Sequence, residues 1–177
     1  VVTVAPLQFH HRPPSGYGFS IHIANVSRNI IMESANPDAI GERGHLMFAH
    51  NADARIENVE IVELGRTNKS IPINDPVIIS GVLQEGTGLN RRARYPIHFH
   101  RTGVDPNSTP AVVRGVSVVG SPGWGFVNHS SYVLYEDNVA FDVFGAAFVT
   151  EDGNEIGAFR RNLAIRGIGT RENVIER

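Results

Sequence analysis

The sequence contains no cysteine, so neither a disulfide framework nor a thiolate metal site is available to it. Its formal net charge of -2 gives no electrostatic reason to expect nucleic acid or an anionic membrane as the main partner. No apolar run approaches the roughly 20 residues that cross a bilayer, and no signal segment opens the sequence. We therefore expect no nucleic-acid partner and no membrane insertion, in a chain that is either cytosolic or a mature or excised piece of an exported protein.

Lysine is almost absent as well, because Lys69 is the only one and every other basic residue is an arginine. The planar guanidinium group pairs with a carboxylate through two parallel hydrogen bonds. This bias suits an acidic ligand such as a uronic-acid sugar, although a lineage preference for arginine explains it equally.

Helix signals are also scarce, since few windows repeat apolar residues at spacings of three and four. Short runs of β-branched and aromatic residues dominate instead, and 18 glycines and 10 prolines separate them. A length of 177 residues is enough for one domain with a real core. The composition therefore predicts an all-β fold in a single domain over residues 1–177.

Four of these runs repeat: "RIENVEIVELG", "VVRGVSVVG", "LYEDNVAFDVFG" and "FRRNLAIRGIG". Asparagine and glycine tolerate the left-handed backbone of a sharp bend, so one such residue before an inward apolar residue is a sensible repeating unit. The last two intervals are 139 − 116 = 23 and 163 − 139 = 24 residues. The alignment matches Val59, Val116, Val139 and Leu163, preceded by Asn58, Gly115, Asn138 and Asn162.

Intervals of this size are typical of one coil of a parallel β-helix, in which short strands stack on those of the preceding coil. The first interval, from Val59 to Val116, is too long for one coil. We therefore predict that residues of about 66–94 form an insertion that leaves the solenoid. A β-sandwich is the main alternative, because it also contains many short strands.

The same alignment predicts a column of polar side chains on another sheet. "GFVNH" matches "AFVTE", which places His129 opposite Glu151, and one coil earlier His100 falls in the same position. His98 lies beside His100 on the same strand face, because side chains of a strand alternate. "MFAHN" adds His50 from the coil before.

Two interpretations of this column compete. Converging imidazoles and a carboxylate form a transition-metal site or an acid–base centre. Alternatively, the column is a polar stack on a solvent-facing sheet. The candidate metal is zinc or another transition metal, with calcium less favoured, and its candidate ligands are His50, His98, His100, His129 and Glu151. The candidate catalytic residues are His98, His100, His129, Glu151 and Asp152.

Four further residues are candidates for substrate binding. Arg94 and Arg101 flank the histidine strand and suit a carboxylate ligand, or alternatively form surface ion pairs. Trp124 suits stacking on a sugar ring, although packing in a core or turn explains it as well. Asp75 lies in the insertion, where long loops often carry function.

The segments "SRNIIMES", "GHLMFAHNADARIENVEIVELG", "RYPIHFHRTG" and "EDNVAFDVFGAAFVTEDG", in this order, resemble the β-helix region that follows the G8 domain in one protein family. This family contains cell-migration-inducing hyaluronidase, its transmembrane relative and the fibrocystins. The resemblance covers residues of roughly 20–155, and "YPIHFH" is its most specific element. No complete G8 domain precedes the matched region, so the chain looks like a bacterial-type relative or a fragment of a longer protein.

The resemblance implies a right-handed parallel β-helix and an extracellular or cell-surface location. It also implies binding or cleavage of hyaluronan in some members, whereas others have no established enzymatic role. We therefore expect a β-helix that binds an acidic polysaccharide. In one version of this expectation it also cleaves the polysaccharide, as a hydrolase or a lyase. The alternatives are a non-catalytic structural or adhesive module of a surface protein and a cytosolic sugar-processing β-helix. The sequence indicates no oligomeric state.

Overall fold

The computed structural model describes residues 8–9, 12–50 and 53–169. Within these ranges the chain is all-β apart from one short 3-10 helix, η1 (Ile40–Glu42). None of these residues belongs to a helix long and apolar enough to cross a lipid bilayer. The predicted all-β class is thus confirmed, and every strand pair outside one hairpin is parallel.

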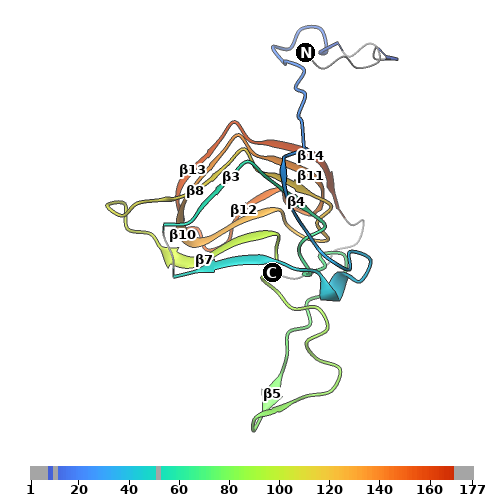
Figure 1. Ribbon diagram of the computed structural model, residues 1–177, viewed down its shortest axis with the longest axis vertical. Helices are drawn as coiled ribbons and strands as arrows, with labels where there is room; N and C mark the ends of the chain where they lie inside the picture. The colour runs from blue at the N-terminus through green and yellow to red at the C-terminus, as the bar shows by residue number, and fades with distance from the viewer. Residues whose placement is uncertain (1–7, 10–11, 51–52, 170–177) are drawn as a thin grey trace.

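One parallel sheet has strands from five separate parts of the chain, in the order β1-β4-β9-β11-β14. After each strand of this sheet, the chain leaves the sheet, passes through one or more other strands and then returns. The returning strand pairs with the one that the chain left (Figure 1). The strands are β1 (Ile30–Glu33), β4 (Val59–Val62), β9 (Ser117–Val119), β11 (Val139–Phe144) and β14 (Leu163–Ile168).

The remaining parallel strands are organised around the long strand β10 (Phe126–Glu136). Its first half pairs with β7 and β12, and its second half pairs with β8 and β13. A register shift between His129 and Ser131 separates the two halves. Strand β2 extends the first group and β3 extends the second. These strands are β2 (Leu46–Ala49), β3 (Arg55–Glu57), β7 (Ile97–Gly103), β8 (Ala111–Arg114), β12 (Phe148–Thr150) and β13 (Ile156–Arg160).

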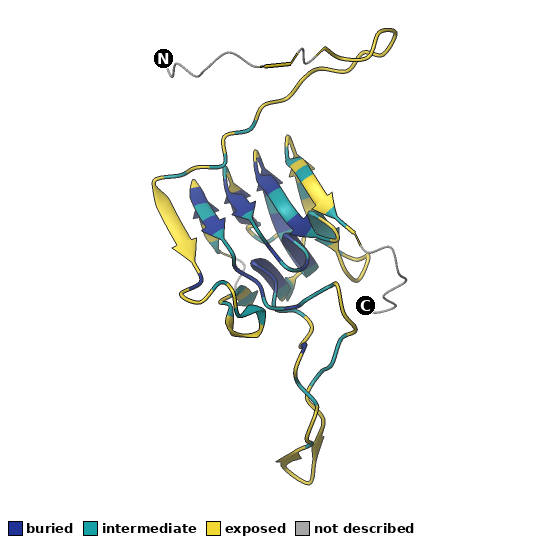
Figure 2. Cartoon of the chain, turned by 90° about the vertical axis from the view of Figure 1, so that its right-hand side faces the viewer, coloured by how far each residue is buried: buried dark blue, intermediate teal, exposed yellow. Residues whose placement is uncertain are grey.

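Apolar side chains repeat at equivalent positions of neighbouring strands and fill the space between the sheets. Phe48 stacks on Phe99 and Phe126 stacks on Phe148, in both cases with ring centroids 4.8 Å apart. Tyr135 is fully buried and donates its hydroxyl to the carbonyl of Val127 at 3.0 Å. Figure 2 shows that the buried residues concentrate in the stacked strands. Parallel stacking of this kind is opposite to the antiparallel pairing of a β-sandwich.

The predicted bends occur in every repeat, but not always at the predicted residue. Asn58 and Gly115 have φ angles of 56° and 63°, in the left-handed region, as expected. A Cβ atom at Gly115 would lie 2.6 Å from Oδ1 of Asn58, so a larger residue there would have to displace the Asn58 side chain. In the next two repeats Asp137 and Arg161 adopt the left-handed conformation, with φ angles of 55° and 53°.

The strand pairing explains this difference. Val139 pairs with Ser117 and not with Val116, so the predicted alignment is wrong by one residue at this step. Asn138 consequently points inward, is fully buried, and accepts a hydrogen bond from the Val116 amide at 2.9 Å. Its amide group also donates to Oδ1 of Asn162 at 3.0 Å. Asn138 and Asn162 therefore satisfy buried backbone groups between repeats and, unlike Asn58, do not themselves form the bends.

Residues 66–94 connect β4 to β7 and contain the only antiparallel strand pair among the described residues, β5 (Ile78–Ile79) and β6 (Val82–Leu83). The Arg66 amide donates to the Arg94 carbonyl at 2.8 Å and closes the base of this segment. Figure 1 shows β5 far from the stacked strands. The side-chain amide of Asn90 donates to the carbonyls of Asn68 and Pro72, each at 2.9 Å, and so fixes the path of the segment near its base.

Candidate functional site

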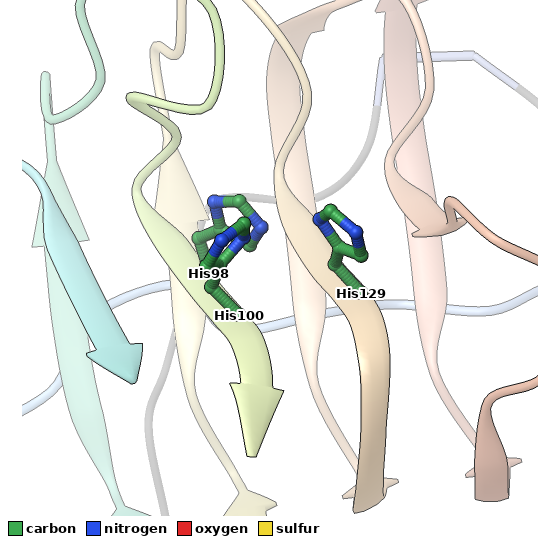
Figure 3. A group of neighbouring side chains, drawn as sticks. All are labelled: His98, His100 and His129. Carbon is green, nitrogen blue, oxygen red and sulfur yellow. The ribbon is translucent and has the colours of Figure 1, made fainter. Parts of the chain in front are cut away.

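Three histidines converge on one face of neighbouring strands. His98 and His100 lie on β7, and the strand pairing places His129 of β10 directly opposite His100, as the sequence predicts. One ring nitrogen from each of the three lies within 4.8 Å of the others. Figure 3 shows the three imidazoles gathered between the two strands.

The backbone bends immediately after this cluster. Arg101 follows His100 with a φ angle of 54°, and Ser130 follows His129 with a φ angle of 46°. Both residues therefore adopt the left-handed conformation, and the strand pairing shifts at this point. The histidines thus occupy the last regular positions before a bend, where polar side chains from adjacent strands can meet.

The buried His98 has a fixed protonation pattern when it is neutral. Its side chain is 0% exposed, and its Nδ1 lies 3.0 Å from the carbonyl oxygen of Ala93. Because a carbonyl only accepts, Nδ1 carries the hydrogen and Nε2 keeps its lone pair. This buried Nε2 makes no hydrogen bond, although it lies 3.3 Å from Oε2 of Glu151. A neutral His98 therefore directs the lone pair of Nε2 into the cluster, beside Glu151.

Two carboxylates flank His129. Its Nδ1 lies 3.1 Å from Oε2 of Glu151, and its Nε2 lies 2.9 Å from Oδ2 of Asp152. Strand β12 brings both acids here, because Asn128 pairs with Thr150 and the Glu151 amide donates to the Asn128 carbonyl at 3.1 Å. The predicted position of Glu151 opposite His129 is thus confirmed. One oxygen of Glu151 lies within 3.3 Å of nitrogens from both His98 and His129.

His100 completes the cluster as a neutral imidazole. Burial lowers its pKa first, and the neighbouring rings of His98 and His129 lower it further. Its Nδ1 is buried and makes no hydrogen bond. At neutral pH the ring is therefore neutral, so one of its two nitrogens carries a lone pair that a metal could use.

His98, His100 and His129 could hold a metal ion. The atoms that would coordinate it are Nε2 of His98, a nitrogen of His100 and Nδ1 of His129, with a carboxylate oxygen of Glu151 beside them. In metal-binding histidines the second ring nitrogen donates to a carbonyl or carboxylate. The remaining nitrogens match this pattern, because Nδ1 of His98 contacts the Ala93 carbonyl and Nε2 of His129 contacts Asp152. A tetrahedral site with bonds of about 2.0–2.1 Å has ligand atoms about 3.3 Å apart. The spread of 4.8 Å among the imidazoles means that a metal would draw at least one ring inward.

Glu155 holds the turn that carries Glu151 and Asp152, and sequence reasoning did not identify it. Its carboxylate accepts hydrogen bonds from the amides of Glu151 at 3.1 Å, Asp152 at 2.7 Å and Gly153 at 2.8 Å. The amide of Ser130, at 3.1 Å, ties the same carboxylate to β10. Burial opposes ionisation of Glu155, but these backbone donors outweigh it and lower its pKa. Glu155 therefore links the acidic turn to the strand that carries His129.

Glu155→Ala is expected to lower the free energy of unfolding by about 2 kcal/mol, because four amides lose a charged acceptor. Urea unfolding at pH 7 measures this loss. The folded-state pKa lies below that of the unfolded chain, so the contribution is present above about pH 4.3 and disappears as the pH falls through the folded value. Glu85→Ala, at an exposed position of the hairpin segment, is the control. Equal stability of the two variants at pH 7 would contradict the assigned role.

The cluster opens into a cleft of about 640 Å³, within the usual range for ligand pockets. Arg94 and Trp124, predicted to bind substrate, both line it. The Trp124 ring stacks on Tyr95 with centroids 5.0 Å apart and lies 4.0 Å from the ammonium group of Lys69. The lining residues are Arg92, Ala93, Arg94, Tyr95, His100, Trp124, His129, Thr150, Glu151 and Asp152.

Three predicted residues lie outside this arrangement. Ala49, and not His50, pairs with His100, so the predicted position of His50 in the column is wrong, and its side chain is exposed. Arg101 is exposed and does not line the cleft. Asp75 does not line it either, but forms an ion pair with Arg92, which does. Asp75 therefore holds the position of Arg92, a residue of the cleft wall, without lining the cleft itself.

Residues 71–175 match the model of the CEMIP beta-helix family. The chain belongs to this family. The matched residues include His98, His100, His129 and both acids of the β12 turn. The resemblance seen in the sequence is thus confirmed.

Two G8 domain-containing proteins of Dictyostelium discoideum are similar to this CEMIP beta-helix chain. One is 25% identical over 159 residues and the other is 26% identical over 153 residues. Each alignment covers 85% of this chain, but only 9% and 11% of the respective relative. The chain therefore spans about a tenth of the length of these relatives. No solved structure matches it.

Proposed function

We propose that this chain is a right-handed parallel β-helix that binds an acidic, hyaluronan-like polysaccharide outside the cell or at its surface. In this proposal the polysaccharide lies in the cleft over the histidine cluster, with Arg94 near its carboxylates and Trp124 beside a sugar ring. Membership of the CEMIP beta-helix family supports this function, as does the combination of cationic and aromatic side chains in one cleft.

A divalent transition metal, preferentially zinc, is part of the proposal. The observation that carries it is the pair of buried nitrogens of His98 and His100 that make no hydrogen bond, beside His129 and Glu151. Nitrogen-rich sites of this kind prefer zinc and related metals to calcium, which takes six to eight oxygen ligands. Bound there, the ion supplies positive charge that neutralises a uronate carboxylate in the cleft.

Cleavage of the polysaccharide is a further part of the proposal. Glu151 and Asp152 face different nitrogens of His129, at 3.1 and 2.9 Å, and both line the cleft. The hydrogen bond from Ser130 lowers the pKa of Asp152 despite burial, and its interaction with His129 adds to this effect. Asp152 is therefore suited to a role as the ionised carboxylate, whereas Glu151 belongs to the histidine cluster. Asp75 pairs with Arg92 and does not line the cleft, so it is not suited to a catalytic role.

The test combines metal analysis with polysaccharide binding. The purified chain is expected to bind one zinc ion, and His100→Ala is expected to weaken that binding by about 100-fold, because one ligand is lost. Calorimetry with zinc measures the affinity. Hyaluronan oligosaccharides then test binding, and released reducing or unsaturated ends distinguish a hydrolase from a lyase. The matched control is His50→Ala, at an exposed histidine outside the cluster.

A non-catalytic structural or adhesive module is the second candidate function. It is favoured by the ion-pair contacts of His129 with Glu151 and Asp152, because these side chains can satisfy one another without a metal or a ligand. This candidate predicts a metal-free protein that binds no acidic oligosaccharide and whose His100→Ala variant is as stable as the wild type. That combination of results would overturn the metal and polysaccharide proposal.

A further inference from the structure

A second, smaller cavity lies at the base of the segment 66–94 and is lined by arginines. Its volume is about 160 Å³, and Arg66 and Arg91 line it together with Gly41, Gly88 and Leu89. This volume is several times what a single water molecule needs, so the cavity has room for one carboxylate or sulfate group. Its size thus suits a single anionic group.

The arginines that line this cavity form no ion pair within the described part of the chain. Six other arginines there do form ion pairs with carboxylates. The guanidinium groups of Arg66 and Arg91 donate to backbone carbonyls instead. Arg94 likewise donates to a carbonyl, although its charge also acts on Asp75 and lowers the pKa of that carboxyl group. Arg66 and Arg91 therefore have no carboxylate in ion-pair contact among the described residues.

The positive charges of these arginines lower the pKa values of neighbouring basic groups. Burial lowers the pKa of Arg66 first, and the charges of Arg94 and Arg91 lower it further. Burial also lowers the pKa of His45, to about 4, with additional repulsion from Arg66, Arg94 and His98. His45 is therefore neutral at pH 7, and the arginines around it carry the charge. The pKa of His45 thus responds both to the arginines and to His98 of the histidine cluster.

The chain itself connects the two cavities. Arg91 lines the small cavity, Arg92 and Arg94 line the large cleft, and the carbonyl of Ala93 between them contacts His98. Four consecutive residues thus run from one cavity to the other.

We propose that Arg66 and Arg91 form a subsite for one anionic group of the acidic polysaccharide, a carboxylate or a sulfate ester, next to the main cleft. This inference rests on the proposed polysaccharide binding, which it deepens by assigning the residues that select a charged polymer over a neutral one. Guanidinium groups suit both anions, because each binds two oxygens in parallel.

The first experiment measures oligosaccharide binding by calorimetry with the variant Arg66→Gln/Arg91→Gln. The probes are a hyaluronan decasaccharide, the same decasaccharide with its carboxyl groups reduced to alcohols, and a chondroitin 4-sulfate decasaccharide. The double variant is expected to bind hyaluronan 10- to 100-fold more weakly than the wild type, since each lost charge-assisted pair is worth about tenfold. Its affinity for the reduced, neutral probe is expected to be unchanged. The sulfated probe carries a sulfate ester in addition to its carboxylates, and the double variant is expected to bind it at least 10-fold more weakly than the wild type does.

Arg55→Gln is the matched control, because Arg55 is an exposed arginine of β3 that lines neither cavity. It is expected to bind all three probes as the wild type does. Unfolding curves verify that the variants fold. Wild-type affinity of the double variant for hyaluronan would overturn the subsite and leave the proposed function standing.

A second experiment tests the subsite without a polymer. Phenylglyoxal modifies accessible arginines, and mass spectrometry reports the rate at Arg66 and Arg91. Sodium glucuronate or sodium sulfate is expected to slow modification of these two residues at least threefold and to leave Arg55 unaffected. Protection without any polymer binding would keep the anion subsite and overturn the proposed function. Equal rates with and without both anions would overturn the subsite.

Discussion

His98→Ala is expected to abolish zinc binding and to destabilise the fold at the same time. The side chain is fully buried, its Nδ1 contacts the Ala93 carbonyl at 3.0 Å, and its ring lies 5.5 Å from that of Tyr95. Removing it leaves a cavity and an unpaired carbonyl, which together cost about 2–4 kcal/mol. It also removes a proposed ligand, which weakens zinc binding by about 100-fold or more.

Two conditions separate these effects. In excess chelator, urea unfolding reports only the lost packing and hydrogen bonding. With zinc at about 100 times the wild-type dissociation constant, the wild type gains about 2.7 kcal/mol and the variant gains almost nothing. His50→Ala, at an exposed position outside the cluster, is expected to behave as the wild type in both conditions. If zinc stabilises His98→Ala as strongly as it stabilises the wild type, the ligand assignment is wrong.

Asn138→Ala is expected to lower the free energy of unfolding by about 3–5 kcal/mol. Its side chain is fully buried, accepts from the Val116 amide at 2.9 Å and donates to the Val113 carbonyl at 3.0 Å. Alanine leaves both backbone groups buried without partners, at about 1–3 kcal/mol each, and removes the hydrogen bond to Asn162. Because these contacts join successive repeats, the whole stack is affected.

Chemical unfolding of Asn138→Ala at pH 7, followed by circular dichroism, measures this loss. Asn154→Ala serves as the control, since Asn154 is exposed and makes no hydrogen bond in the described structure. We expect a change below about 0.5 kcal/mol for the control. A loss of less than 1 kcal/mol for Asn138→Ala would show that the buried asparagines are not what holds the repeats together.

The histidine cluster illustrates how far sequence comparison reaches. The recurrence of "GFVNH" and "AFVTE" places Glu151 opposite His129, and the strand pairing agrees. The same reasoning fails for His50. It aligned His50 with His100 because both are histidines, and not because their strands are in that register. The structure pairs Ala49 with His100, and a slip of one residue moves a side chain to the opposite face of a strand.

The bends illustrate the same limit. Asparagine at position 138 resembles the bend residue Asn58 in sequence, but its side chain is buried and bonded to backbone groups of the neighbouring repeat. Asp137 takes the left-handed position instead, since the inward hydrogen bonds of Asn138 fix the register. Likewise, no sequence pattern singled out Glu155, Arg66 or His45, because their roles depend on backbone amides or charges that only folding brings close.

The sequence by itself determined the all-β class, the repeating strands, the family and the meeting of His98, His100, His129 and Glu151. These features follow from local patterns of apolar residues, turn residues and repeats, which are readable along the chain. Only the tertiary structure decided the exact register, the fixed tautomer of His98, the cleft and the small cavity lined by arginines. Each of these depends on hydrogen bonds, burial and charges between residues far apart in the sequence, and a shift of one position changes which side chains meet.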